Sequence, residues 1–543
     1  MIIVIIIILL VILIGIIQRI RRINELKKTL KYNYGKFNKN HIDETKLNKI
    51  SRYYYDKKIV KKIDDITFND LNMKEVFEAM DNSISSVGSE YLFAEIRNLD
   101  ADDKKLKFRD SLAEYYNINE EKRIETQIDL LRIGKFKRES VYDNILNINN
   151  FVVTSNLFEF LLIGIFIGTI CMSIYKEEYS IFFIMSLVLN VIFYYYKRAN
   201  IKSHLITFKL ILNMLTSINK IYNKNSNELK IFEKDIKKIK EDLLGLNFAS
   251  RLINENNGDL LSMLLDYIYM VIHIDIIVSN YIVKILIKNM NSIIRLYEII
   301  GEIELAINIA SFRERINEYS KPEFIDDLIL NIDNIYHPLI DKPIKNSINT
   351  TKSILLTGSN ASGKSTFLKT IALNAILAQT IYTTASDKYI ASKFNIMSSM
   401  AIRDNLFNNE SYYIVEIKSL KRILDSDKSI PVLCFIDEIL RGTNTIERIS
   451  ASKVILEKLT KMNCLCIAAT HDIELTTMLN DCYDNYHFEE QISGKDIMFD
   501  YKLKKGPSNT RNAIKLLEII GFEDDIIHKA NNEVDILEKD ASI

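Results

Sequence analysis

Apolar residues recur every three or four positions along two long stretches of the chain, residues 57–135 and 197–315, with Lys and Glu between them and few turn residues. This spacing predicts amphipathic helices. Three short apolar runs follow, within residues 354–356, 431–438 and 464–469, and they are typical of buried strands. The pattern therefore predicts a mainly α-helical region followed by an α/β domain, in which helices flank a parallel sheet.

The first residues form a longer apolar run. Residues 1–17 contain no charged side chain, and Arg19, Arg21 and Arg22 follow them. A secretory signal would carry its positive charge before the run and a small-residue cleavage site after it, and neither is present. We interpret residues 1–20 as an uncleaved membrane anchor, with its basic end in the cytoplasm and its N-terminus outside.

Two further apolar runs, residues 160–175 and 181–196, are separated by the short charged turn at residues 176–178. Their lengths and the basic residues beyond them predict a transmembrane hairpin with cytoplasmic ends. A pair of buried core helices is the alternative interpretation. With the anchor, the hairpin gives three spans, which predicts a multi-pass protein of the cell membrane whose other domains are cytoplasmic.

A fourth apolar run, residues 260–287, contains charged residues at spacings that do not suit lipid. We interpret it as a buried helix, although an association with the membrane stays open. Its single histidine, His273, is more typical of a packed core residue than of a metal ligand, because no second His lies at helical spacing.

Composition narrows the possible functions. The chain has 543 residues, enough for about three domains. Its 71 basic and 71 acidic residues balance, so any contact with DNA would need a local basic patch. The five cysteines have no C-x-x-C spacing, which favours reduced thiols in a cytosolic compartment over a zinc site.

The clearest chemical motif lies at residues 353–369, SILLTGSNASGKSTFLK, where a short strand leads into G-x-x-x-x-G-K-S and then a helix. Glycines let backbone N–H groups surround a phosphate, the lysine reaches the outer phosphates, and the serine hydroxyl can ligate Mg²⁺. The motif predicts ATP and Mg²⁺ as ligands. The expected binding residues are Gly358, Ser359, Asn360, Ala361, Ser362, Gly363, Lys364, Ser365 and Thr366.

Two later strands end in residues that can act on the same nucleotide. The run at 431–438 ends in Asp437 and Glu438, and the run at 464–469 is followed by Thr470 and His471. We expect Asp437 to share Mg²⁺ with Ser365, and Glu438 to orient the attacking water. His471 is the second expected catalytic residue, because it would follow a neighbouring strand of the same sheet.

These motifs resemble those of the MutS family. The phosphate loop is similar to the family's T-G-P-N-M-G-G-K-S, residues 439–444 (ILRGTN) to I-G-R-G-T-S, and residues 468–471 (AATH) to the family's A-T-H stretch. Residues 63–99 and 296–310 resemble segments of the family's helical core. The resemblance implies a P-loop ATPase related to ABC ATPases.

The resemblance also implies a homodimer. Ser411 occupies the place of a serine that reaches the partner subunit's nucleotide, and Glu416 that of a glutamate in the same segment. His337 stands in the family's R-H-P motif, with Tyr336 in place of Arg, and the resemblance makes it an expected nucleotide-binding residue. Residues 506–534 resemble the helix-turn-helix through which these ATPase domains dimerise. The family's mismatch-reading domain has no counterpart in the stretch before the core.

We therefore expect a membrane-anchored MutS-like ATPase that hydrolyses ATP as a dimer and moves helical levers. Binding of mismatched or branched DNA is the first alternative, and an ABC-type transport ATPase is the second. The expected domains are an anchor (1–20), a helical core-like region (21–150), a transmembrane hairpin (157–196), lever and core helices (197–330), the ATPase domain (331–505), and a helix-turn-helix with the tail (506–543).

Overall fold

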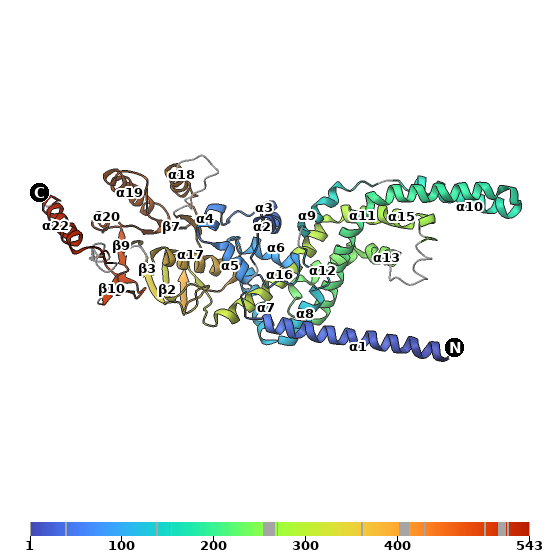
Figure 1. Ribbon diagram of the computed structural model, residues 1–543, viewed down its shortest axis with the longest axis horizontal. Helices are drawn as coiled ribbons and strands as arrows, with labels where there is room; N and C mark the ends of the chain where they lie inside the picture. Colours follow the sequence, from blue (N-terminus) through green and yellow to red (C-terminus); the bar gives the residue numbers. More distant parts are fainter. Residues whose placement is uncertain are drawn as a thin grey trace. The chain divides into compact units, whose positions relative to one another are not determined.

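The computed structural model describes most of the chain (Figure 1). The residues outside the description are 1, 38–40, 137–138, 154, 253–266, 269, 360–361, 401–411, 428, 494–495, 509–516, 518–520 and 542–543. The described chain divides into two compact units. Unit 1 consists of residues 1–58, 80–94 and 109–314, and unit 2 of residues 59–79, 95–108 and 315–543.

Unit 1 is helical, as the three-and-four spacing predicts. Helices α7 (Asp103–Ile118) and α16 (Met290–Ile316) are divided between the two units, and the last residues of α5 (Met73–Met80) and α6 (Ser86–Glu95) also fall in the other unit. The other helices of unit 1 are α1 (Ile2–Asn33), α2 (Glu44–Ile50), α3 (Arg52–Asp56), α6 (Ser86–Glu95), α8 (Glu120–Leu130), α9 (Val141–Leu146), α10 (Leu157–Tyr175), α11 (Ser180–Lys224), α12 (Glu233–Asp242), α13 (Leu244–Leu252) and α15 (Ile274–Lys288).

The core of unit 1 forms where α6 packs closely against α16. A Cβ on Gly301 would come within 2.3 Å of the Tyr91 ring, so only glycine allows this approach. Beside it, the buried Glu302 carboxylate accepts hydrogen bonds from Tyr91 Oη at 2.7 Å and from Arg109 Nε at 2.5 Å. A buried charge is tolerated when it is paired in this way. Helix α6 lies within residues 63–99, and α16 contains residues 296–310, the two segments that resemble the MutS core.

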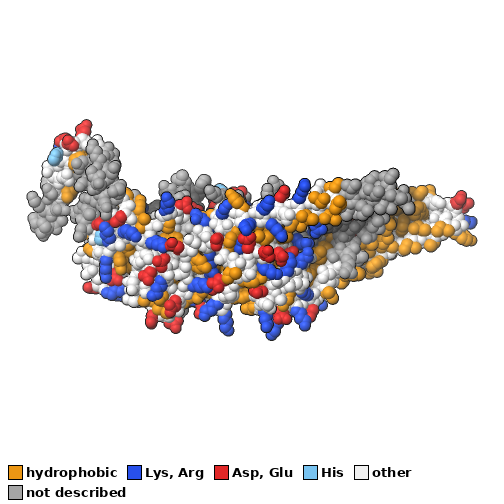
Figure 2. All heavy atoms as spheres, turned by 90° about the horizontal axis from the view of Figure 1, so that it is seen from below, with side chains coloured by type: hydrophobic (Ala, Val, Ile, Leu, Met, Phe, Trp, Pro, Cys, Tyr) orange, Lys and Arg blue, Asp and Glu red, His pale blue; other side chains and the backbone are white. Residues whose placement is uncertain are grey.

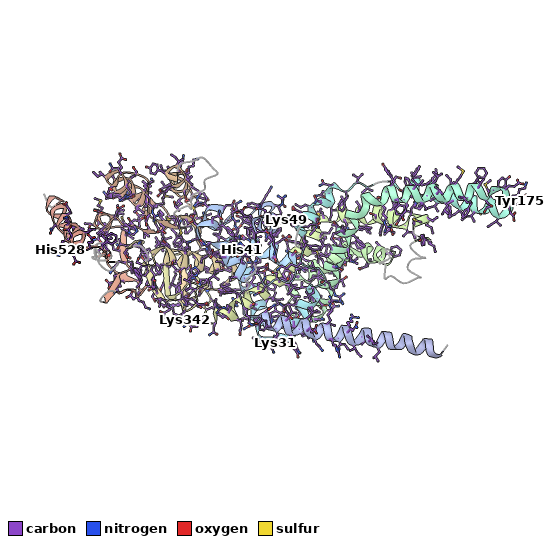
Figure 3. The ribbon with its side chains drawn as sticks, in the orientation of Figure 1. Lys31, His41, Lys49, Tyr175, Lys342 and His528 are labelled. Atoms are coloured by element: carbon purple, nitrogen blue, oxygen red, sulfur yellow. The ribbon has the colours of Figure 1, made fainter. Side chains whose placement is uncertain are left out.

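Helices α10 and α11 form an antiparallel hairpin whose apolar side chains are exposed. Figure 2 shows these side chains along the hairpin up to its charged turn, and Tyr175, at the end of α10, lies at its tip (Figure 3). Residues Leu157–Tyr175 and Glu177–Arg198 are the two described stretches long and apolar enough to cross a membrane. Only 6% and 17% of their residues are buried, so they are not core helices of this chain.

Two helices extend beyond the ends of the predicted membrane spans. Helix α11 continues unbroken from the hairpin to Lys224, through the predicted boundary at 196. Helix α1 continues past residue 20 to Asn33, and the side chains of residues 2–12 lie outside the description. His273 is buried, as expected, with Nε2 placed 3.1 Å from the Asn190 carbonyl oxygen.

Unit 2 contains the predicted parallel sheet, with strand order β12-β9-β4-β8-β7-β6. Strands β9, β4, β8, β7 and β6 run parallel, and β12 pairs antiparallel with β9. A second sheet has the order β1-β5-β2-β3, and β10 and β11 form a hairpin. The strands are β1 (Glu323–Phe324), β2 (Leu330–Ile335), β3 (Asn346–Thr350), β4 (Ser353–Thr357), β5 (Lys388–Ala391), β6 (Asn395–Ser399), β7 (Val432–Asp437), β8 (Cys464–Ala469), β9 (Tyr483–His487), β10 (Glu490–Ser493), β11 (Asp496–Phe499) and β12 (Lys504–Lys505).

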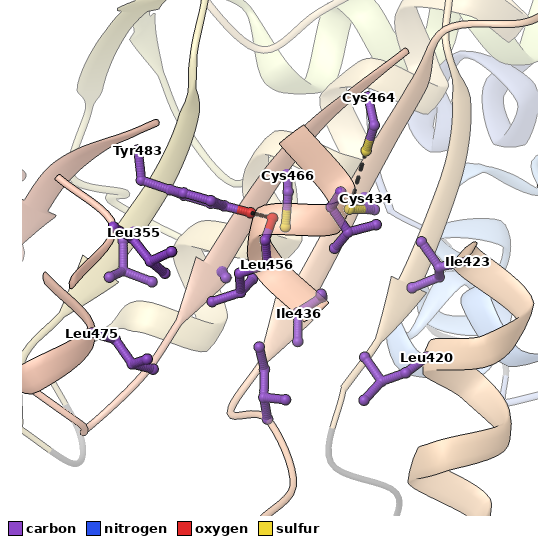
Figure 4. Close-up of a cluster of buried hydrophobic side chains, with 14 of the residues drawn as sticks. Leu355, Leu420, Ile423, Cys434, Ile436, Leu456, Cys464, Cys466, Leu475 and Tyr483 are labelled. Atoms are coloured by element: carbon purple, nitrogen blue, oxygen red, sulfur yellow. Dashed lines mark hydrogen bonds between the residues drawn. The ribbon is translucent and has the colours of Figure 1, made fainter. Parts of the chain in front are cut away.

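Helices cover the large sheet. The helices of unit 2 are α4 (Asp65–Asp70), α5 (Met73–Met80), α17 (Lys364–Ile381), α18 (Tyr412–Leu424), α19 (Thr445–Thr460), α20 (Glu474–Met478) and α22 (Asp524–Ala541). Side chains from α18, α19 and α20 form one buried cluster with β4, β7 and β8 (Figure 4). This cluster includes the free thiols of Cys434, Cys464 and Cys466, with 3.6 Å between the first two sulfurs.

Candidate functional site

The predicted phosphate loop joins β4 to α17. Gly358 adopts φ 145° and Gly363 φ 101°, conformations that favour glycine. A Cβ on Gly358 would lie 2.7 Å from the Phe488 carbonyl oxygen and 3.0 Å from Ser362 Oγ, so the loop needs a residue without a side chain there. Asn360 and Ala361 lie outside the described residues.

Polar groups line the described part of this loop. Lys364, the first residue of α17, donates from Nζ to the carbonyl oxygens of Gly358 and Ser359, at 2.7 and 2.8 Å. Ser362 Oγ is buried and has no hydrogen-bond partner among the described residues. Thr366 is exposed in the first turn of the helix. The loop thus combines an unpartnered hydroxyl with a cation and a helix N-terminus, which together suit an anion.

Ser365 connects the loop to the end of strand β7. Its Oγ donates to Asp437 Oδ2 at 2.5 Å. Strands β4, β8 and β7 are adjacent and parallel, and therefore the loop after β4 and the last residue of β7 lie at the same edge of the sheet. The structure thus places the two expected Mg²⁺ ligands in direct contact.

Glu438, the residue after β7, is held by the side chains of His471 and Arg441. Its Oε1 lies 2.9 Å from His471 Nε2, and its Oε2 pairs with Arg441 Nε. Burial acts to raise the pKa of Glu438, but the hydrogen bonds from His471 and Arg441 outweigh it, and the pKa is lowered from its usual range. The backbone of Glu438 has φ 60°, uncommon for a residue with a side chain. Glu438 is therefore an ionised carboxylate in a fixed orientation.

Three residues of this site were not among those predicted. Arg441 lies in the ILRGTN segment but was assigned no role, and only the structure shows its contact with Glu438. Arg448, on α19, pairs with Asp472, the residue after His471, through Nη2–Oδ1 at 2.6 Å and Nε–Oδ2 at 3.0 Å. Asp472 directly follows His471 in the sequence, which was an available signal for that residue alone.

Helix α18 supports the loop that follows Glu438. The buried Glu416 carboxylate accepts a hydrogen bond from the Leu440 amide, and burial raises the pKa of Glu416. A Cβ on Gly442 would come within 3.2 Å of Tyr413 Cβ, so this loop packs closely on the helix. The predicted nucleotide contact Ser411 lies just before α18, outside the described residues.

His337 lies beside α17. Its Nδ1 accepts a hydrogen bond from the Leu339 amide at 3.3 Å. Burial lowers the pKa of His337, and the charge of Lys369 on α17 lowers it further. His337 is therefore a neutral imidazole whose described surroundings lie along the helix that follows the phosphate loop. A direct contact with nucleotide stays a prediction.

Comparison with known proteins identifies relatives of unit 2. Residues 354–538 match the family model described as MutS domain V. Over 228 residues, 39% of this chain, the sequence is 32% identical to a DNA mismatch repair protein MutS from Rickettsia felis. It is 29% identical over 256 residues, 45% of the chain, to the protein of that name from Pseudothermotoga lettingae. These matches span only 26% and 31% of the two relatives.

Proposed function

Because this chain belongs to the MutS family through its domain V at residues 354–538, we propose that it binds and hydrolyses ATP as a homodimer. The observation that carries the proposal is the contact between Ser365 and Asp437, which joins the phosphate loop to the strand that Glu438 follows. The homodimer rests on the resemblance of residues 506–534 and of the segment containing Ser411.

The described side chains fit a nucleotide with Mg²⁺. Ser365 and Asp437 supply the hydroxyl and carboxylate oxygens that this ion prefers. The unpartnered Ser362 hydroxyl suits a phosphate oxygen. When bound, Mg²⁺ neutralises charge on the phosphates.

Three side chains of this chain supply the remaining chemistry. Glu438 is ionised, so its carboxylate can accept a hydrogen bond from the attacking water and orient it. His471 fixes the direction of that carboxylate through its 2.9 Å contact. Charge from Lys364 at the N-terminus of α17 favours the outer phosphates.

Two substitutions in the purified full-length chain test this proposal. Lys364→Ala should weaken both nucleotide binding and hydrolysis, since it removes the cation of the loop. Glu438→Gln should keep binding but lower hydrolysis on the order of a hundredfold or more, because the amide is a poor proton acceptor. Lys352→Ala, at an exposed lysine before β4, is the control. Undiminished hydrolysis in both test variants would reject the proposal.

The relatives suggest a role for the ATP cycle in DNA repair. Both are named DNA mismatch repair proteins, and on that basis the first candidate role is binding of mismatched or branched DNA. Binding through phosphates should fall steeply between about 50 and 200 mM salt. Mismatched, branched and perfect duplexes should therefore be compared across that range. Absence of binding to all three at the lowest salt would exclude this role.

The hairpin suggests a second candidate role, in which the ATPase is attached to a membrane. Eighteen or more consecutive apolar residues are long enough to span a bilayer, and α10 has 19 residues with one charged side chain. Soluble monomers rarely expose an apolar surface of this extent. We propose that the hairpin, together with the anchor at residues 1–20, makes the chain a multi-pass membrane protein with its ATPase domain in the cytoplasm.

Cys171 provides a direct test, because this free thiol is exposed on α10. If the hairpin lies in a bilayer, a membrane-impermeant maleimide should modify Cys171 only after detergent is added. A variant with Cys171→Ser and Ser180→Cys moves the thiol to the charged turn, where it should react in intact cells. Reaction of Cys171 in untreated membranes would overturn the attachment.

A further inference from the structure

A short helix from the N-terminal half of the chain covers an edge of the large sheet. Strand β6 is an edge strand of the described sheet, so the backbone groups on its outer side need partners from outside the sheet. Thr67 and Asp70, three residues apart on α4, supply them. Thr67 Oγ1 accepts from the Ser398 amide at 3.2 Å, and Asp70 Oδ2 accepts from the Met400 amide at 3.1 Å.

Asp70 makes a second contact at the same place. Its Oδ2 also accepts from Ser398 Oγ at 2.7 Å. Arg422 of α18 joins the same residues, since it donates to the Ser398 carbonyl oxygen and lies 2.6 Å from Asp64, the residue that caps α4. A helix terminus, a strand end and a second helix therefore meet at Ser398.

The end of β6 lies beside the candidate magnesium ligand. Strands β6 and β7 are parallel, with Ser399 opposite Ile436, so Met400 follows β6 where Asp437 ends β7. Asp70 fixes the amide of Met400 and the side chain of Ser398. Asp70 therefore holds the end of β6, which is the strand next to β7 and Asp437.

The same N-terminal segment also reaches the helix of the phosphate loop. Asn72, two residues after Asp70, accepts a hydrogen bond through Oδ1 from Lys369 Nζ at 2.6 Å. Lys369 lies on α17, which begins with Lys364 and Ser365. Asn72 has φ 53°, a conformation that turns the chain between α4 and α5. One short segment thus contacts α17, which carries Ser365, and the end of β6, the strand next to the one that carries Asp437.

We propose that Asp70 and Asn72 are positioning residues for the nucleotide site, which hold Asp437 and Ser365 in the relative position that Mg²⁺ requires. This inference rests on the proposed ATPase function. Asp70 is partly buried, and a desolvated carboxylate is costly unless hydrogen bonds compensate it. A helix that served only to cover an edge strand could do so with neutral side chains such as Thr67.

The test measures equilibrium binding of N-methylanthraniloyl-ATP to the full-length chain, with Mg²⁺ and with EDTA. The quantity compared is the ratio of the two affinities. Asp70→Ala should reduce this ratio about tenfold, since residues that orient a metal ligand affect metal affinity by 10–100-fold. Asp70→Asn retains one acceptor oxygen and should reduce it less. Asn72→Ala should act in the same direction, and Asn69→Ala, at an exposed position of α4, should leave the ratio unchanged.

The outcomes separate the two proposals. If the unmodified chain binds no nucleotide, the proposed ATPase function fails. The positioning role is wrong if the unmodified chain binds nucleotide and both Asp70→Ala and Asn72→Ala have the same ratio of affinities with Mg²⁺ and with EDTA as that chain. It is equally wrong if the two variants weaken binding by the same factor with and without Mg²⁺. Should Asp70→Ala fail to fold, Asp70→Asn and Asn72→Ala decide by the same ratio.

Discussion

Strand β7 and helix α10 are both apolar, but the side chains of β7 are buried whereas most of those of α10 are exposed. In β7 all six residues are buried, whereas in α10 the one buried residue is Glu159, the only charged residue of the helix. Glu159 accepts a hydrogen bond from Lys197 Nζ at 2.9 Å, while the apolar side chains around it are exposed. An apolar sequence therefore does not by itself identify a protein core. In α10 the charged residue is buried and the apolar residues are exposed, which is the pattern expected where lipid is the solvent.

The largest expected difference between the two parts is in stability. Phe435→Ala in β7 removes a fully buried ring and should lower the free energy of unfolding by about 3–5 kcal/mol. Phe160→Ala on α10, where the side chain is 58% exposed, should cost less than about 0.5 kcal/mol. Thermal unfolding of the two variants in the same detergent measures both. Equal losses would contradict the environments described here.

Membrane partitioning should show the next largest effect. Ile165→Lys places a charge on the exposed face of α10 and should cost about 2.5–3.5 kcal/mol if that face contacts lipid. Ile118→Lys, at an exposed position at the end of α7, should have no such cost. The measurement is the fraction of each variant that stays with membranes after an alkaline wash. An unchanged fraction for Ile165→Lys would mean that the exposed face is not in lipid.

The buried ion pair of the hairpin should contribute less. Glu159→Gln removes the charge that faces Lys197 and should lower stability by about 1–3 kcal/mol, the cost of a buried charged group without its partner. The exposed pair of Asp525 and Lys529 on α22 provides the contrast, because Asp525→Asn should cost less than about 1 kcal/mol. Denaturation midpoints of the two variants give the comparison, and a larger effect for the exposed pair would refute it.

The smallest expected effect concerns the contact between the two hairpin helices. Thr169 Oγ1 and Ser186 Oγ lie 2.8 Å apart. Thr169→Val keeps the shape of the side chain but removes this hydrogen bond. Such bonds between membrane helices average about 0.6 kcal/mol, so the thermal midpoint should fall only slightly. If the thermal midpoint of Thr169→Val fell as far as that of Phe435→Ala, the contact between Thr169 and Ser186, rather than the surrounding solvent, would determine the stability of the hairpin.

Local patterns were sufficient to predict three adjacent strands of the six-stranded sheet and the contact between two of the expected site residues. The runs that became β4, β7 and β8 are short, apolar and followed by turn or charged residues, and parallel strands bring their carboxyl ends together. The contact between Ser365 and Asp437 follows from that geometry. The family match agrees with the predicted resemblance over residues 354–538.

Contacts between distant residues could not be predicted in this way. The spacing of residues 57–135 predicts helices but not which of them joins the sheet. Thr67 and Ser398 are 331 positions apart, and only folding brings them together. The contact of Arg441 with Glu438 was missed for the same reason, because a three-residue spacing in a loop does not define where Arg441 points.

Helix α11 has a mechanical consequence. It runs for 45 residues without a break, from the hairpin turn into the body of unit 1. At about 1.5 Å per residue this is a rod on the order of 65 Å long. Such a rod has no joint at which a rotation could be absorbed, so a tilt of about five degrees at one end would displace the other by roughly 6 Å. A small movement among the helices of unit 1 would therefore become a large stroke at the charged turn.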